Sequence, residues 1–329
     1  MKIGLVDADG HNFPNLPLMK ISAYHKNKGD SVEFAVPLLH YDKVYVSRVF
    51  GDEYSTFLDV CYNADEVIYG GTGFAIKVEN GKEVYYKELD QNLPYEIEHQ
   101  YPDYSLYPEY TNGKAYGFLT RGCSNNCEFC IVSKKEGLCS VKVANLNEWW
   151  KGQNEIILLD PNILACKDRK ELLQQLIDSK AMVDFTQGLD ARFCTVEICK
   201  MLKSIKTKQW HFAFDFMKNK KAIIRGLKNF KNVMGDKFPK DSSVSVYCLT
   251  NFNTTFDEDY ERVLLLKEMG YSPDIRIYRK NTAPRLTKDL QRWCNNRLIY
   301  WAEPNFLNYV PRNGKPIKEL YFNEVKKWL

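Results

Sequence analysis

The chain has 329 residues, 44% of them hydrophobic, which is enough for a large core and suggests two domains rather than one. Its net charge of +4 is the sum of −8 over residues 1–200 and +12 over residues 201–329. The basic residues 201–329 either form solvated helix faces or bind an acidic partner such as nucleic acid. The sequence has no apolar run of 18 residues and no signal-peptide pattern in "MKIGLVDADG", so we expect a cytoplasmic protein and no membrane span. Because the cytoplasm is reducing, the ten cysteines are expected to be thiols or metal ligands.

The first predicted elements alternate strands with helices. Strands are expected at residues 2–8, 31–36, 43–50 and 66–71, with helices at 16–30 and about 55–64. Such alternation predicts a parallel sheet, so residues 1–74 are predicted to form a Rossmann-like domain, without the G-x-G-x-x-G dinucleotide fingerprint. Residues 75–113 are rich in Tyr and Pro and are predicted to form an irregular connection with one hairpin.

A second alternating series covers residues 114–281. Its predicted strands are 114–120, 155–160, 182–188, 210–216, 243–250 and 274–280, and its predicted helices are 168–180, 195–205, 219–230 and 257–270. The series predicts a partial (βα)6 barrel of the TIM type, in which chemistry takes place at the carboxyl ends of the strands. The predicted fold class is therefore α/β, with residues 282–329 as a C-terminal extension that contains one final helix.

Three cysteines follow directly after the first strand of this second series, in "TRGCSNNCEFCIV". Cys123, Cys127 and Cys130 have the spacing C-x3-C-x2-C, so one loop can bind three irons of a [4Fe–4S] cluster and leave the fourth iron open. A structural zinc site needs four ligands, and Cys139 or His11 could supply the fourth only through special folding.

The cysteine spacing, with Phe129 before the last cysteine, resembles the radical S-adenosylmethionine superfamily. The longer string "LTRGCSNNCEFCIV" is similar to members with an N-terminal cobalamin-binding-like, Rossmann-like domain. The resemblance implies an enzyme that reductively cleaves S-adenosylmethionine at a [4Fe–4S] cluster. The resulting 5′-deoxyadenosyl radical then takes hydrogen from a substrate, and a flavodoxin or ferredoxin supplies the electron.

The same resemblance suggests which residues contact S-adenosylmethionine. Asp160 and Asn162 stand where the family often has a Gly-Gly-Glu-like motif, although "DPN" can also be a simple turn. After the third strand of the series, Arg192 suits a carboxylate or phosphate, with an Asp190 cap beside a surface arginine as the alternative. The complete predicted set of cofactor-binding residues is Phe129, Asp160, Asn162, Gln187, Arg192, Asp215 and Asn251.

Strand alternation distinguishes the two faces of residues 210–216. It places Phe212 and Phe214 on one face and His211 and Asp215 on the other, so Asp215 is expected to face the barrel interior and bind ribose hydroxyls, while His211 is structural. Cys248 is a candidate hydrogen donor if it faces the interior, and otherwise a small core residue.

Cobalamin is not expected as a cofactor. Cobalamin domains commonly carry D-x-H-x-x-G, and here Asp9 and His11 are followed by "NFPN", without the glycine. The basic helix at residues 218–240 suggests nucleic acid as a substrate. The competing hypothesis is a non-enzymatic module that binds nucleic acid or protein and uses the cysteines for a structural metal.

Overall fold

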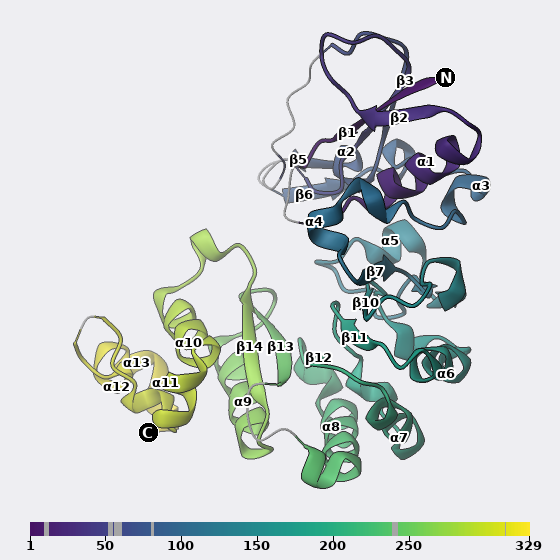
Figure 1. Cartoon of the computed structure of the whole chain (residues 1–329). Coiled ribbons are helices and arrows are strands. Elements are labelled where there is room, and N and C mark those ends of the chain that lie inside the picture. Colours follow the sequence, from purple (N-terminus) through teal and green to yellow (C-terminus); the bar gives the residue numbers. More distant parts are fainter. Residues whose placement is uncertain (10–12, 52–54, 56–60, 80–81, 239–242, 313) are drawn as a thin grey trace. The chain divides into compact units, whose positions relative to one another are not determined.

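The structure is a computed structural model that describes residues 1–9, 13–51, 55, 61–79, 82–238, 243–312 and 314–329. The chain divides into two compact units, Met1–Val183 and Asp184–Leu329, which are described in turn (Figure 1). Both units combine helices with parallel sheets, which confirms the predicted α/β class. None of the described helices is long and apolar enough to cross a membrane.

The first unit begins with a four-stranded parallel sheet. Its strands are β1 (Lys2–Asp7), β2 (Ser31–Phe34), β3 (Tyr41–Ser47) and β4 (Ala64–Gly70), in the order β2-β1-β3-β4. Helix α1 (Leu16–Asn27) connects β1 to β2, and the Asn15 side chain caps its start by accepting the Leu18 N–H. The apolar side chains of Ile3 and Leu5 pack against Leu18 and Ile21, which joins helix to sheet. The predicted strands are confirmed.

A connection of short elements follows the first sheet. It contains α2 (Thr72–Ala75), the antiparallel hairpin β5 (Ile76–Glu79) and β6 (Lys82–Tyr85), α3 (Tyr95–Glu98) and α4 (Pro108–Thr111). The predicted hairpin is thus confirmed. The helix predicted at about residues 55–64 lies largely outside the described residues, and Ala64 begins β4.

The second series of strands begins in the first unit. Strand β7 (Lys114–Gly117) pairs in parallel with β10 (Glu155–Leu158), and β11 (Met182–Phe185) completes the sheet in the order β11-β10-β7. Between β7 and β10 lie the two-residue strands β8 (Thr120–Arg121) and β9 (Val141–Lys142), which pair antiparallel, and the short helix α5 (Val132–Glu136). Helix α6 (Arg169–Ser179) then leads to β11.

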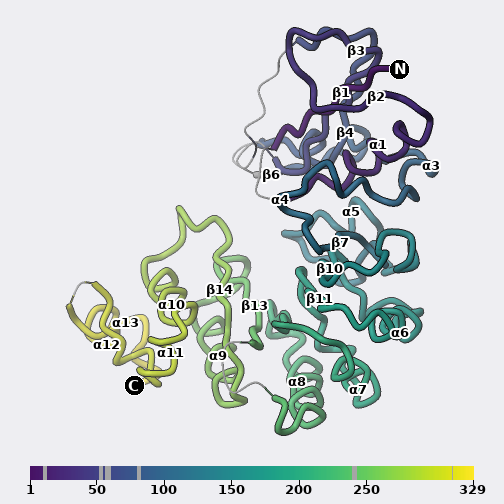
Figure 2. The backbone as a smooth tube through the Cα atoms, viewed as in Figure 1, coloured from purple at the N-terminus to yellow at the C-terminus, as the bar shows by residue number. Residues whose placement is uncertain are grey.

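The second unit contains a parallel sheet in the order β12-β13-β14. The strands are β12 (Trp210–Ala213), β13 (Val244–Thr250) and β14 (Ser272–Ile277). Helix α8 (Lys220–Met234) lies between β12 and β13 in the sequence, and Figure 2 shows the chain passing from β13 through α9 (Phe256–Glu268) to β14. Helix α7 (Val196–Ser204) precedes β12. These helices and strands agree with the predicted series.

The phenylalanine face of β12 is buried, as alternation predicts. Phe212 and Phe214 are fully buried, and the Phe212 ring lies edge-on to Phe230 of α8, with centroids 4.9 Å apart. His211 bonds Ser245 through Nδ1 at 2.8 Å and stacks on Tyr247 at 5.0 Å, which agrees with a structural role.

The C-terminal extension contains more helix than the sequence predicts. Besides α12 (Ile317–Leu320) and α13 (Phe322–Val325), it forms α10 (Arg285–Asn295) and α11 (Arg297–Ala302). Trp293 of α10 lies 4.9 Å from Tyr300 and 5.4 Å from Phe306 between ring centroids, and Phe306 lies 5.6 Å from Tyr260 of α9, so aromatic rings join the extension to the preceding helix. Leu286, Leu290 and Trp293 at positions i, i+4 and i+7 are the sequence signal that identifies α10.

Candidate functional site

The cysteine loop, residues 122–131, begins at the carboxyl end of β8 and leads into α5. Gly122 has a φ of +84°, and a Cβ at this position would lie 2.2 Å from the Cys139 carbonyl oxygen. Only glycine therefore fits directly before the first cysteine. The Cys123 N–H donates to the Gly137 carbonyl at 3.2 Å, which ties the start of the loop to the end of α5.

Glu136 at the end of α5 holds the base of the cysteine loop with both carboxylate oxygens. Its Oε1 accepts a hydrogen bond from Arg121 Nη1 at 2.7 Å, and its Oε2 accepts one from the Gly122 N–H at 2.9 Å. The Arg121 guanidinium also lies over the Phe118 ring, 3.5 Å from its centroid. Sequence analysis missed Glu136, because nothing in the pattern distinguishes it from a solvated helix residue.

The three thiols of the loop have similar environments. Cys123, Cys127 and Cys130 are all partly buried and none forms a disulfide. The Cys130 N–H donates to the Cys127 carbonyl at 3.0 Å, so the last two cysteines share a tight turn. Asn126, directly before Cys127, has a φ of +44°, a left-handed conformation that asparagine adopts more readily than most other non-glycine residues.

We tested whether the loop suits an iron–sulfur cluster by its donor set. Three thiols stand on one partly exposed loop and none is lost to a disulfide, which is the chemistry that such a cluster requires. Among the residues that the structure describes, no three His, Cys, Asp or Glu side chains are gathered as ligands of one metal ion. The donor set therefore fits a cluster, and binding one requires the loop to draw its sulfurs together.

Asp160, predicted to contact the cofactor, instead supports the start of the cysteine loop. Its carboxylate accepts hydrogen bonds from the Leu119 N–H at 2.8 Å, the Thr120 N–H at 2.7 Å and Thr120 Oγ1 at 2.6 Å. The side chain is buried, and burial raises its pKa to about 7, against the opposing effect of these three donors. Both carboxylate oxygens therefore bind the chain directly after β7, and a contact of Asp160 with the cofactor stays a prediction.

Asn162 lies directly against the first cysteine. Its Nδ2 donates to Cys123 Sγ at 3.6 Å, and its side chain is only 3% exposed. The sulfur of Cys123 is thus the hydrogen-bond acceptor of a buried amide. The contact of Asn162 in the structure is with a cysteine, and its contact with the cofactor stays a prediction.

The predicted cofactor residues after β11 belong to the second unit. Asp190 caps the short helix that follows by accepting the Arg192 N–H, and its carboxylate also binds the Arg192 guanidinium at 2.9 Å and 2.6 Å. The side chain of Arg192 is about one quarter exposed, and Gln187 is exposed. The capping alternative for Asp190 is confirmed, and it orients the Arg192 guanidinium at the same time.

Asp215 and Asn251 lie at the carboxyl ends of neighbouring strands. Asp215 Oδ1 accepts the Leu249 N–H at 2.9 Å, and burial raises the pKa of this carboxyl. Asn251 Nδ2 donates to the Tyr278 carbonyl at 2.8 Å, which joins the loops after β13 and β14. The two side chains are therefore held in place by the backbone around them.

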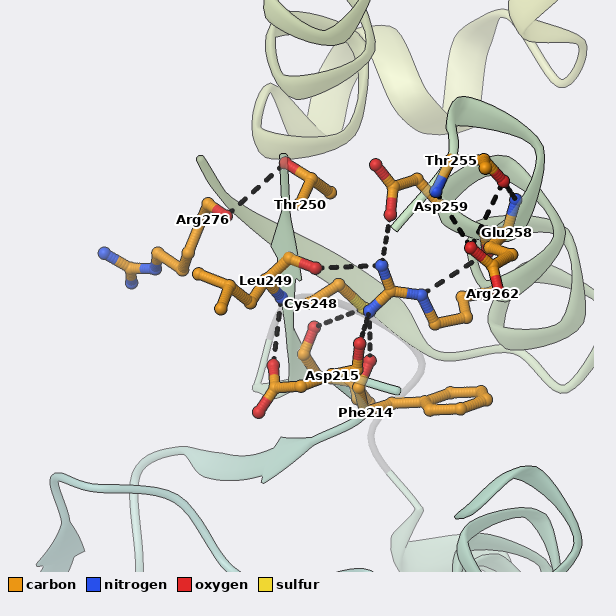
Figure 3. Close-up of polar contacts among 11 residues, drawn as sticks. Phe214, Asp215, Cys248, Leu249, Thr250, Thr255, Glu258, Asp259, Arg262 and Arg276 are labelled. Atoms are coloured by element: carbon orange, nitrogen blue, oxygen red, sulfur yellow. Dashed lines mark hydrogen bonds and ion pairs between the residues drawn. The ribbon is translucent and has the colours of Figure 1, made fainter. Parts of the chain in front are cut away.

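Arg262 of α9 supports this end of the sheet from within the core, as Figure 3 shows. Its Nη1 donates to the carbonyls of Phe214 at 2.7 Å and Asp215 at 2.6 Å, while Nη2 donates to the Leu249 carbonyl at 2.8 Å and to the Asp259 carboxylate. One buried guanidinium thus joins the chain after β12 to the end of β13. Sequence analysis missed it, because an arginine three residues after Asp259 resembles a surface ion pair.

Cys248, the candidate hydrogen donor, is completely buried. Alternation along β13 places it with Val244 and Val246, on the face opposite to Ser245, which bonds His211. Burial raises the pKa of the thiol to about 12. The structure therefore places Cys248 in the core, away from the face where hydrogen donation was predicted.

Asp9 and His11 form the incomplete cobalamin-binding pattern of the sequence, and His11 lies outside the described residues. Asp9 is 2% exposed, and its carboxylate accepts the Val49 N–H at 2.6 Å and the Phe50 N–H at 3.3 Å. These bonds connect the end of β1 to the chain after β3. Asp9 therefore has a structural task in the first sheet.

Comparisons with known proteins add no family assignment: no family model matches the chain, and no curated protein matches it.

Proposed function

We propose that the chain is a radical S-adenosylmethionine enzyme, with a Rossmann-like domain at residues 1–74 and a partial (βα)6 barrel at residues 114–281. The observation that carries the proposal is the cysteine loop, in which three thiols that form no disulfide follow the first strand of the second series and Asn162 donates to one of them. Three protein ligands leave one iron of a [4Fe–4S] cluster open for S-adenosylmethionine.

The residues of the cysteine loop and Glu136 have separate roles in this proposal. Cys123, Cys127 and Cys130 would hold the cluster, which, when bound and reduced by a flavodoxin or ferredoxin, supplies the electron that cleaves S-adenosylmethionine to a 5′-deoxyadenosyl radical. Glu136 keeps the base of the cysteine loop closed through Arg121.

Within the second unit, two residues have side chains suited to the cofactor contacts that the resemblance implies. Asp215 Oδ1 is engaged by the Leu249 N–H, and we assign Oδ2 to a ribose hydroxyl. Arg192, oriented by Asp190, is the proposed contact for the methionyl carboxylate. Phe129 of the cysteine loop, Gln187 and Asn251 complete the proposed set, whereas cobalamin is not part of it.

Anaerobic reconstitution with iron and sulfide tests this function. We expect about four irons per chain and no zinc, and a change in the cluster's electron paramagnetic resonance spectrum on adding S-adenosylmethionine. One zinc per chain, with no response to the cofactor, would instead support a non-enzymatic module with a structural metal.

The amide of Asn162 gives a second, independent prediction. Hydrogen bonds to cluster sulfurs stabilise the reduced state, so Asn162→Ala is expected to lower the reduction potential of the cluster. Asn162→Gln keeps an amide donor and is expected to recover part of the difference. Potentiometric titration of the two variants at equal iron content provides the measurement, and equal potentials in Asn162→Ala and the unaltered protein would refute the role.

A further inference from the structure

A run of positive charge lies at the carboxyl end of β14 in the second unit. Residues 275–288 contain five Lys or Arg side chains and no Asp or Glu. The segment runs from β14 through its following loop into α10. An uninterrupted run of one charge at the functional end of a parallel sheet would attract an anionic ligand.

The cations of this segment are available to a ligand. Arg276, Arg279, Lys280 and Arg285 are all exposed. Arg279 and Lys280 form no ion pair with any carboxylate among the described residues. Arg276 pairs with Asp274 at 3.0 Å and Arg285 pairs with Asp289 at 3.4 Å, yet the two arginine side chains stay 61% and 52% exposed. The segment therefore keeps most of its charge toward solvent.

Two aromatic rings lie beside these cations. Phe252, after β13, and Tyr278, after β14, meet edge to face with centroids 4.8 Å apart, and both are partly exposed. The Tyr278 N–H donates to the Thr250 carbonyl at 3.0 Å, and Asn251 Nδ2 donates to the Tyr278 carbonyl at 2.8 Å. The two loops thus hold an aromatic pair in a fixed position.

The backbone of the same loops is strained. Among the described residues, five non-glycine residues have a positive φ, and three of them are here: Asn251 at +61°, Asn253 at +50° and Arg279 at +48°. Asparagine adopts this conformation more readily than arginine does, and such conformations cluster at binding sites. The strain therefore agrees with a functional role for this edge.

We propose that the β13–β14 edge, formed by Phe252, Arg276, Tyr278, Arg279 and Lys280, binds single-stranded nucleic acid. The cations would contact phosphates while an unpaired base stacks on the aromatic pair. An acidic peptide would contact the cations but would not need the two aromatic rings. The bases of a duplex are paired and stacked, so they could not stack on these rings. The binding needs no cluster; that the bound strand is the substrate rests on the proposed function.

Fluorescence anisotropy with a labelled 12-nucleotide single-stranded RNA, its DNA equivalent, a duplex and polyglutamate tests the edge on cluster-loaded protein. We expect the single strands to bind best, with log K falling linearly with log salt. The double variant Arg279→Gln with Lys280→Gln should weaken binding at least tenfold and reduce the salt slope by about 1.4. Tyr278→Ala should weaken binding about tenfold with little change in slope.

The matched control is Lys200→Gln with Lys206→Gln, which removes the same charge from two exposed positions in and directly after α7. We expect the control to change the affinity less than about twofold. No binding at low salt, equal losses in the two double variants, or tighter binding of duplex or polyglutamate would overturn the proposal. Iron is counted on the same samples of unaltered protein. If that protein carries its iron but does not bind single-stranded nucleic acid, the proposed binding edge is refuted and the proposed function is not. If it binds the strand but carries no iron, the proposed function is refuted and the edge is not.

Discussion

Arg262→Met is expected to lower the free energy of unfolding of the second unit by about 3–5 kcal/mol. The substitution leaves the carbonyls of Phe214, Asp215 and Leu249 without their buried donor, and it leaves the Asp259 carboxylate without its counter-charge. A buried polar group that loses its partner pays the full cost of desolvation. Urea unfolding followed by far-UV circular dichroism measures the difference.

Lys220→Met provides the matched control for Arg262→Met. It breaks the 2.6 Å ion pair between Lys220 and Glu261, which lies on the other side of α9 with both side chains more than a third exposed. Exposed pairs contribute about 0–1 kcal/mol, so little change is expected. If Arg262→Met destabilised the protein no more than Lys220→Met does, the guanidinium would not support the sheet as we describe.

Replacing any one of Cys123, Cys127 or Cys130 with Ala is expected to remove most of the bound iron after reconstitution. Two thiolates from one loop cannot hold a cluster with a single defined open iron. The fold should persist, because all three side chains are only partly buried. Iron content per chain, read beside the circular dichroism spectrum, measures both effects.

Cys139→Ala is the control for the cysteine variants. Cys139 is the next cysteine along the chain and is exposed, so it is the nearest thiol that could replace a ligand. We expect this variant to retain its iron and its absorbance. If Cys139→Ala lost metal as completely as Cys123→Ala, a four-thiolate site would replace the three-thiolate one proposed here.

Strands and helices with a regular pattern of apolar residues were predictable from the sequence. Phe212 and Phe214 form the buried face of β12 because side chains of a strand alternate, and α9 starts where Thr255 and Glu258 form a capping box. Helix α10 was missed because proline and several charged residues around Leu286 and Leu290 obscured its apolar stripe.

The direction in which single polar side chains point was much less predictable. Asp160 carries the same carboxylate whether it faces a cofactor or the N–H groups of Leu119 and Thr120, and only the packing of the strands decides between them. The same holds for Arg262, whose helix position resembles a surface ion pair although the side chain is fully buried. Spacing along the chain identified the three cysteines, because their chemistry depends on the loop itself.

The most direct test of the central claim is the amount of 5′-deoxyadenosine that reconstituted protein forms from S-adenosylmethionine under dithionite. The account predicts product from the unaltered protein and none above background from the variant in which Cys123, Cys127 and Cys130 are all Ala. Equal product from the two proteins, or none from unaltered protein that carries about four irons per chain, would contradict the proposed function.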